Sequence, residues 1–104
     1  MEFKGTKGEW KVKHSESKNA FNVVGTALGG NYKIARCPYF VDNRLVEFSV
    51  RDKKECEANA KLIAAAPELL KALQLARFDL KFFGAKENAP MLNDIDEVIK
   101  KAIG

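Results

Sequence analysis

The stretch that decides the fold is Ala20–Leu28, AFNVVGTAL, followed by Gly29-Gly30-Asn31 and by Tyr32–Cys37, YKIARC. β-Branched and aromatic residues favour strands on both sides of the short break. Glycine and asparagine tolerate the positive φ angles of a tight turn. The stretch therefore predicts a β-hairpin. Alternation along its second strand predicts one set of side chains on the same side: Tyr32, Ile34 and Arg36.

Before this hairpin, Glu9–His14 alternates between charged and less polar residues. The alternation has the period of a strand and puts Trp10, Val12 and His14 on one face. Residues 15–19, SESKN, have the composition of a turn. We therefore expect a first strand that pairs with the hairpin.

After the hairpin, Pro38 cannot donate a ladder hydrogen bond and is expected to end the third strand. Residues 38–44 then form a loop, and Leu45–Arg51 has the alternating pattern of a fourth strand. Its apolar positions are Val46, Phe48 and Val50. The segments together predict an antiparallel meander of three to four strands.

The second half of the chain has a helical pattern. Asp52 is expected to be the N-cap, with Glu55 completing a variant of the capping box. Apolar residues then recur at steps of three and four, as on one stripe of a helix. The stripe comprises Leu62, Ala66, Leu69, Leu73, Ala76, Leu80 and Phe83, widened by Ile63 and Leu70. Pro67 lacks an amide hydrogen and predicts a kink or break near Ala65-Ala66.

Gly84 is expected to end this helical region, and Ala85–Ala89 to form a linker. Pro90–Ile103 then predicts a last helix. Its inward positions are expected to be Met91 or Leu92, Ile95, Val98, Ile99 and Ala102. The predicted fold class is α+β, a single domain over residues 1–104 in which an N-terminal antiparallel sheet packs on C-terminal helices.

The composition is that of an ordinary globular protein of 104 residues, 46% hydrophobic and 31% charged. No apolar run approaches the roughly 20 residues that span a bilayer, and the first residues lack the apolar stretch of a signal peptide. We therefore expect a cytoplasmic protein that does not enter a membrane.

The net charge of +4 is unevenly placed. Residues 1–54 hold eleven Lys or Arg against six acidic residues, whereas residues 55–104 hold seven against eight. This asymmetry favours an anionic partner for the sheet half, and a solvated basic face explains it as well.

The sequence contains no pattern of a catalytic or metal site. Cys37 and Cys56 lie far apart without a CxxC motif, and His14 is the single histidine. A helix N-terminus near Cys56 would lower its pKa, but packed thiols are the favoured interpretation of both cysteines. Three acidic residues of the last helix are explained by favourable charge near a helix N-terminus: Asp94, Asp96 and Glu97. We therefore expect no catalytic residues, no metal, no cofactor and no enzymatic activity.

One set of residues combines cations with aromatic rings around the predicted third and fourth strands. Arginine grips phosphates and aromatic rings stack on bases, so the set could hold a nucleotide-like ligand or nucleic acid. The candidate binding residues are Tyr32, Lys33, Arg36, Tyr39, Phe40, Arg44 and Arg51, with Lys53 and Lys54 beside them. The alternative is that the aromatic residues belong to the core and the cations to the solvated side of the sheet.

The run Glu57–Leu73, EANAKLIAAAPELLKAL, resembles a helix common in small proteins of tailed phages and prophages. Those proteins carry a Gly-x-Trp segment near their start, which Gly8-Glu9-Trp10 matches, and continue with short strands before the helix. The resemblance implies a phage accessory gene. It implies no activity and assigns no functional residues.

Together these features favour a non-enzymatic phage accessory protein that acts in the host cytoplasm by binding. Its partner would be a host protein that it inhibits, or a nucleotide-like small molecule that it sequesters. The most concrete form is an anti-defence protein, either anti-CRISPR-like or one that sequesters a nucleotide signal. The alternative is a basic nucleic-acid-binding module. A homo-oligomer fits either function, because a small sheet has open edges.

Overall fold

The computed structural model describes residues 3–84 and 90–103. The linker predicted at Ala85–Ala89 therefore lies outside the described residues. The chain forms two compact units: the sheet unit, Thr6–Ala66, and the helical unit, Met1–Gly5 with Pro67–Gly104. The prediction that they make a single domain stays a prediction.

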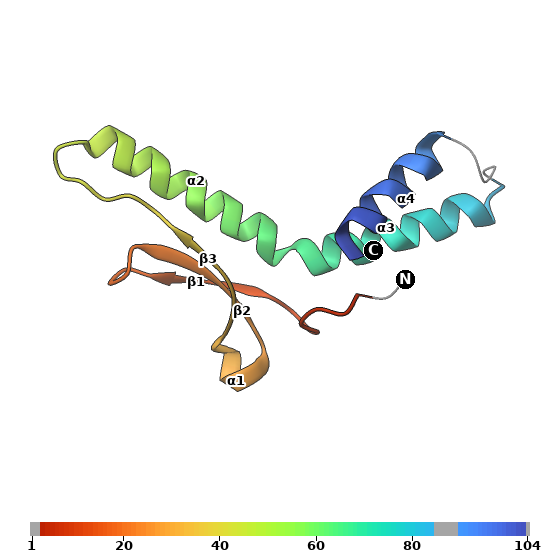
Figure 1. Cartoon of the computed structure of the whole chain (residues 1–104), viewed down its shortest axis with the longest axis horizontal. Coiled ribbons are helices and arrows are strands. Elements are labelled where there is room, and N and C mark those ends of the chain that lie inside the picture. The colour runs from red at the N-terminus through yellow and green to blue at the C-terminus, as the bar shows by residue number, and fades with distance from the viewer. Residues whose placement is uncertain (1–2, 85–89, 104) are drawn as a thin grey trace. The chain divides into compact units, whose positions relative to one another are not determined.

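A three-stranded antiparallel sheet forms much of the sheet unit (Figure 1). Its strands, in the order β1-β2-β3, are β1 (Lys11–Ser15), β2 (Ala20–Gly25) and β3 (Tyr32–Pro38). The predicted hairpin is confirmed, and Pro38 ends β3 as expected, but β2 ends at Gly25 and does not continue to Leu28. The short turn α1 (Ala27–Gly30) joins the two strands, with φ of 64° at Gly29 and 85° at Gly30. Glycine adopts these angles without a steric penalty, which allows the chain to reverse within a few residues.

A β-bulge in β3 changes which side its side chains take. Val23 of β2 pairs with Ala35, but the next residue, Val24, pairs with Lys33, so Ile34 is an extra residue. Ile34 packs against the core together with Ala35, while Lys33 shares the opposite face with Val24. Strict alternation therefore fails here. The prediction that Tyr32, Ile34 and Arg36 share one side is therefore wrong for Arg36, whereas Tyr32 and Ile34 both lie beside Gly25 on the other side.

The predicted fourth strand is also wrong, because Leu45–Arg51 leads into and begins α2 (Val46–Ala64). Its alternating apolar side chains do not form the buried face of a strand: Val46 is 60%, Phe48 44% and Val50 50% exposed. Helical hydrogen bonds start at this point instead. The Leu45 N–H donates to the Asp42 carbonyl oxygen at 3.0 Å, and the Ser49 N–H to the Leu45 carbonyl oxygen at 2.9 Å. The sheet thus has three strands.

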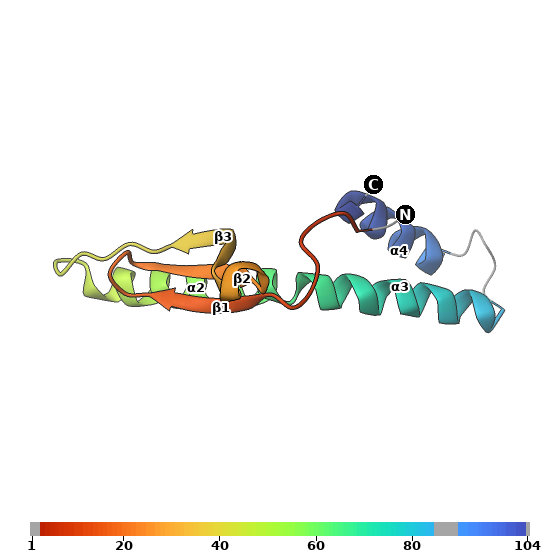
Figure 2. The same ribbon diagram turned by 90° about the horizontal axis from the view of Figure 1, so that it is seen from below.

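The core of the sheet unit lies between the sheet and the second half of α2. The helix runs along one face of the sheet, as two perpendicular views show (Figures 1 and 2). The buried cluster comprises Phe21, Val23, Tyr39 and Ala60, and α2 adds the partly buried Cys56, Ile63 and Ala64. Ala60 is 0% exposed. Because these α2 residues recur at steps of three and four, they form one stripe that holds the helix on the sheet.

The helical unit contains α3 (Ala66–Phe82) and α4 (Pro90–Ile103). The break predicted near Ala65-Ala66 is confirmed, since α2 stops before it and Pro67 lies in the first turn of α3. Gly84, with φ of 93°, follows the end of α3 as the expected helix stop.

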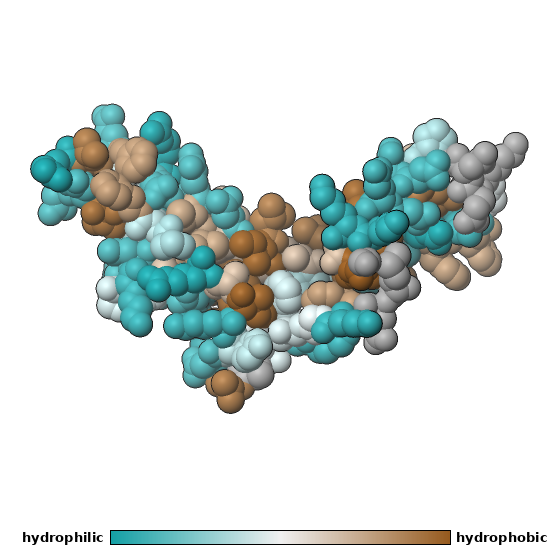
Figure 3. Space-filling model, in the orientation of Figure 1, coloured by the Kyte–Doolittle hydropathy of each residue, from teal (hydrophilic) through white to brown (hydrophobic). Residues whose placement is uncertain are grey.

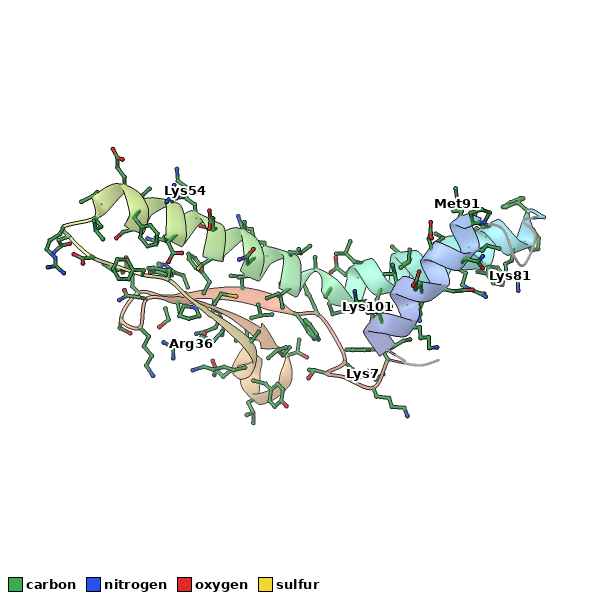
Figure 4. All side chains as sticks on the ribbon, turned by 45° about the horizontal axis from the view of Figure 1, so that its top comes forward. Lys7, Arg36, Lys54, Lys81, Met91 and Lys101 are labelled. Atoms are coloured by element: carbon green, nitrogen blue, oxygen red, sulfur yellow. The ribbon has the colours of Figure 1, made fainter. Side chains whose placement is uncertain are left out.

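The apolar stripe predicted along the helices is only partly buried. No residue of α3, which the structure describes throughout, is buried. Five residues of the predicted stripe are exposed: Leu62, Ala66, Leu69, Ala76 and Phe83. In α4, Leu92 and Ile99 are buried as expected, whereas Val98 and Ala102, which were also expected to lie inward, are exposed. Of the alternatives Met91 and Leu92, Met91 is the exposed one (Figure 4). Periodicity identifies a stripe, but burial also needs a neighbouring element along its whole length.

An ion pair joins α3 to α4. Arg77 Nε donates to Asp96 Oδ1, and Arg77 Nη2 lies 3.3 Å from Asp96 Oδ2. The hydrogen bond from Arg77 holds the pKa of the Asp96 carboxyl below its ordinary value. The first turn of α4 contains no acidic residue, so the helix N-terminus does not account for Asp96 as the sequence suggested. Its partner is Arg77.

Replacement of Ala60 by leucine tests the register of α2. Ala60→Leu inserts a larger side chain into a filled space, and we expect it to destabilise the sheet unit by about 1–3 kcal/mol. Ala58→Leu, on the exposed side of the same helix, should change stability by less than about 0.5 kcal/mol. Urea unfolding followed by Trp10 fluorescence measures both, and equal losses would contradict the register.

The ion pair between α3 and α4 makes the helical unit sensitive to pH. The pKa of Asp96 is lowered in the folded state, so the pair adds stability above the ordinary carboxyl pKa of 3.8 and loses it as the pH falls through the folded value. We expect Asp96→Asn to lower the unfolding midpoint at pH 7, and the difference from wild type to vanish in acid. Asp94→Asn, an exposed neighbour, is the control and should match wild type at both pH values. A pH-independent loss in Asp96→Asn would show that the charge plays no part.

Candidate functional site

Three aromatic rings meet at the edge of the core. The His14 ring stacks on Phe21 with centroids 4.4 Å apart, and His14 Nε2 lies 2.6 Å from the Tyr39 hydroxyl oxygen. Tyr39 is 8% exposed, with Lys53 Nζ 5.6 Å from its ring centre. Tyr39 therefore belongs to the core and is not an exposed ring that could stack on a base. His14 is held in place by the same contacts.

Phe40, the next residue, leaves the core and starts the loop between β3 and α2. Its N–H donates to Asp52 Oδ2 at 2.6 Å, and its ring meets Phe48 edge-on with centroids 5.4 Å apart. Asp52 lies within α2, so its predicted role as the N-cap is wrong. It fixes the position of the loop against the helix instead.

Asp42 organises the rest of this loop. Its carboxylate accepts hydrogen bonds from the Arg44 N–H at 2.9 Å and from the guanidinium nitrogens at 3.2 and 3.0 Å. Its own N–H donates to Ser49 Oγ at 3.0 Å. The bonds from Arg44 lower the pKa of Asp42, and the same contact raises the pKa of Arg44. The loop is thus tied to the first turns of α2 at two points.

The loop and the first turns of α2 expose apolar and charged side chains, Glu47 among them, on more than one side of the helix, and we call this area the junction surface. Its other exposed residues are Phe40, Val41, Arg44, Leu45, Val46, Phe48, Val50 and Arg51. Arg51 lies over Phe48, with its guanidinium carbon 5.7 Å from the ring centre. Apolar and hydrophilic residues alternate over this end of α2 in Figure 3. A shallow hollow of about 430 Å³ lies between residues 44–48 and Arg51.

The rest of the predicted binding set lies on the sheet, away from the junction surface. Arg36 is opposite Asn22 and Lys33 is opposite Val24, on the face that α2 does not cover. Figure 4 shows Arg36 on the side of the sheet away from α2 and Lys54 on the outer side of the helix. Tyr32, at the start of β3, is exposed. The structure therefore separates the predicted set. Tyr39 lies in the core, Tyr32 is exposed at the start of β3, and the others divide between the junction surface and the uncovered face of the sheet.

The strand register defines the second surface, which we call the open sheet face. It comprises Lys11, Lys13 and Ser15 of β1, Ala20, Asn22 and Val24 of β2, and Lys33, Arg36 and Pro38 of β3. Our sequence reasoning did not place Lys11, Lys13 or Asn22 in a candidate site. The alternating pattern of the first two strands could have identified these residues, because it places them on the face of the sheet away from the core residues Val12, Phe21 and Val23.

The two cysteines are free thiols at the side of the core. Cys56 Sγ lies 3.1 Å from the Pro38 carbonyl oxygen. Burial, followed by the negative charge of Asp52, raises the pKa of Cys56. The alternative in which a helix N-terminus activates Cys56 is wrong, because α2 begins at Val46 and Cys56 lies in its middle.

Residues 3–84 and 90–103 are the part of the chain that the structure describes. Within this part of the chain, no helix is both long enough and apolar enough to cross a membrane. The same residues contain no group of three or more His, Cys, Asp or Glu side chains placed to hold a metal ion.

The sheet, the helices and the two exposed surfaces are those of a small α+β protein, and comparison with protein families identifies it as a phage protein. Residues 1–104 match the family model described as Salmonella phage P22 protein Y8K6, and the chain belongs to that family. Comparisons with curated proteins and with solved structures gave no match. The phage origin implied by the Glu57–Leu73 helix is thereby confirmed at the level of the family.

The contact between Asp52 and Phe40 can be tested through a single amide. Asp52→Ala removes the acceptor, so we expect faster hydrogen exchange at the Phe40 amide and a loss of about 1 kcal/mol of stability. Asp52→Asn keeps an oxygen acceptor and should give an intermediate exchange rate. Glu55→Ala, also on α2, is the control and should leave the Phe40 amide unchanged. Equal protection of Phe40 in Asp52→Ala and wild type would show that the bond does not hold the loop.

Proposed function

We propose that this phage protein is a non-enzymatic accessory protein that binds and inhibits a host factor in the cytoplasm of the infected cell. Its most concrete form is an anti-defence protein. The observation that carries the proposal is the junction surface, where large apolar side chains stand exposed beside two arginines. Membership of a phage family supplies the biological setting.

The junction surface has the chemistry of a protein-binding site. Neighbouring exposed apolar residues on a small protein mark interaction sites more often than isolated ones do. Aromatic residues and arginine carry a large share of the binding free energy at protein interfaces. Phe40 and Phe48 already contact each other, and Asp52 holds the Phe40 backbone. A surface ordered before binding loses less conformational entropy when the partner arrives.

Binding without catalysis agrees with the state of the residues that could do chemistry. A nucleophile needs a lowered pKa or a neighbouring base. The pKa of Cys56 is raised, His14 is engaged with Tyr39, and the Asp42 carboxylate is engaged with Arg44. We therefore propose that the side chains of the junction surface act through contact alone.

The proposal predicts a partner that depends on the first turns of α2. Purified protein is mixed with host nuclease effectors of antiviral defence and, separately, with cyclic nucleotide signals. We expect it to bind and inhibit one effector, and Phe48→Ser to weaken that binding about tenfold or more, because truncation of a central aromatic residue costs 1 kcal/mol or more at most interfaces. Calorimetry and nuclease assays measure both effects.

Phe78→Ser is the matched control, since Phe78 is an exposed phenylalanine of α3. It should bind as wild type does, and circular dichroism should show that both variants are folded. Binding of a cyclic nucleotide with no effector would replace inhibition by signal sequestration. Two results would refute a role for the junction surface in anti-defence. Either the protein binds neither an effector nor a cyclic nucleotide, or Phe48→Ser and Phe78→Ser weaken binding equally.

A further inference from the structure

On the open sheet face, the outer strands carry long side chains and the central strand carries short ones. The outer strands carry long cations, with Lys11 and Lys13 on β1 and Lys33 and Arg36 on β3. The central strand carries the short side chains of alanine, asparagine and valine between them. A hollow of about 500 Å³ opens on this face beside Lys13 and Lys33. The face is therefore low along its middle and basic along both sides.

Charge is concentrated on this part of the chain. The sheet unit holds eleven Lys or Arg and seven Asp or Glu, which accounts for the whole net charge of +4. No carboxylate stands among the strand positions of the open sheet face, all of which the structure describes. Glu16 reaches the rim of the hollow from the turn after β1. The strands themselves thus present only positive charge.

A polar group without a partner lies in the middle of this basic face. Asn22 is 8% exposed, and its Oδ1 is buried without a hydrogen bond. Its two cross-strand neighbours are Lys13 and Arg36. A buried acceptor without a donor is costly and calls for an explanation. The cost would be recovered if a ligand brought an N–H group to this position.

We propose that the open sheet face binds double-stranded DNA by entering its major groove. At about 4.8 Å per strand, the axes of the two outer strands lie about 10 Å apart, so the cations that they carry are spaced to reach the two walls of a groove about 12 Å wide. The cations of the outer strands then meet the phosphates on the two walls of the groove, and Asn22 faces the edges of the bases. Asparagine at such a position accepts from the adenine N6 amino group through its Oδ1 and donates to adenine N7.

The two cross-strand neighbours of Asn22 each make one weak contact, which would open on binding. Lys13 Nζ lies 3.4 Å from Asn31 Oδ1, and Arg36 Nη2 lies 3.2 Å from the Lys18 carbonyl oxygen, and both contacts are exposed to solvent. Phosphates offer these cations stronger, charge-assisted partners. As the two side chains turn outward to the phosphates, the amide between them becomes accessible to a base.

The same face is poorly suited to other nucleic acids. Single strands are held mainly by bases stacked on aromatic rings, and the open sheet face has no aromatic residue at its described strand positions. The major groove of double-stranded RNA is too narrow for a protein layer to enter. This proposal is independent of the inhibitor function, because it uses different residues on a different surface.

Fluorescence anisotropy with a labelled 20-base-pair DNA duplex of mixed sequence tests the proposal on the full chain. We expect binding that weakens with salt, with a slope of log K against log salt of about −3 to −4 if each of the cations meets one phosphate. Lys33→Gln should weaken binding and reduce the slope by about 1. Lys54→Gln, on the outer side of α2, is the matched control and should bind as wild type does.

Asn22 is tested by selection from a pool of random duplexes. Wild type should enrich sites with a fixed adenine, and Asn22→Ala should lose about tenfold or more of that preference while keeping the salt slope. Asn22→Gln, which keeps the amide, should retain part of it. Circular dichroism confirms that each variant is folded. Three results would overturn the proposal: no binding to duplex DNA at low salt, tighter binding to single-stranded DNA or to RNA, or equal losses in Lys33→Gln and Lys54→Gln.

Discussion

The packing of Ala60 against the central strand is the contact on which the rest of the structure depends. Alanine has almost no side chain, so the α2 backbone comes close to Phe21 and Val23 and the helix has one position along the sheet. That position leaves the first turns of α2 outside the buried cluster, which receives residues only from the second half of the helix. The apolar residues of those first turns are exposed for this reason. The junction surface is thus a consequence of where the helix is anchored.

The same anchor separates the two candidate surfaces. Because α2 covers one face of a three-stranded sheet, every second residue of β2 is committed to the core and the others to the open face. Asn22 lies directly between Phe21 and Val23 in sequence, and yet it belongs to the opposite surface. A partner on the junction surface and a DNA duplex on the open sheet face would therefore meet different side chains. Both could be bound by one molecule at the same time.

Features of the fold that depend on neighbouring residues could be predicted from the sequence, whereas features that depend on distant contacts could not. The hairpin, the stop at Pro38 and the break at Pro67 were predictable, because local turn chemistry and a missing amide hydrogen determine them. The segment Leu45–Arg51 was not, because its alternating pattern suits a strand. The segment instead begins α2, whose contact with the sheet through Ala60 lies more than two helical turns further on. Of the binding set, Tyr39 went to the core and Arg36 to the open face, a division that requires the strand register.

The bulge in β3 shows how little separates a basic face from an apolar one. If β3 continued in the register that pairs Val23 with Ala35, Ile34 would oppose Val24 on the open face and Lys33 would point into the core. One extra residue reverses this, so that Ile34 joins the core and Lys33 lies on the same side as Arg36. The bulge therefore buries an apolar side chain and keeps a charged one out of the core. A face that excludes Ile34 in this way, with cations on both outer strands and an amide between them, has the arrangement on which the proposed binding of duplex DNA depends.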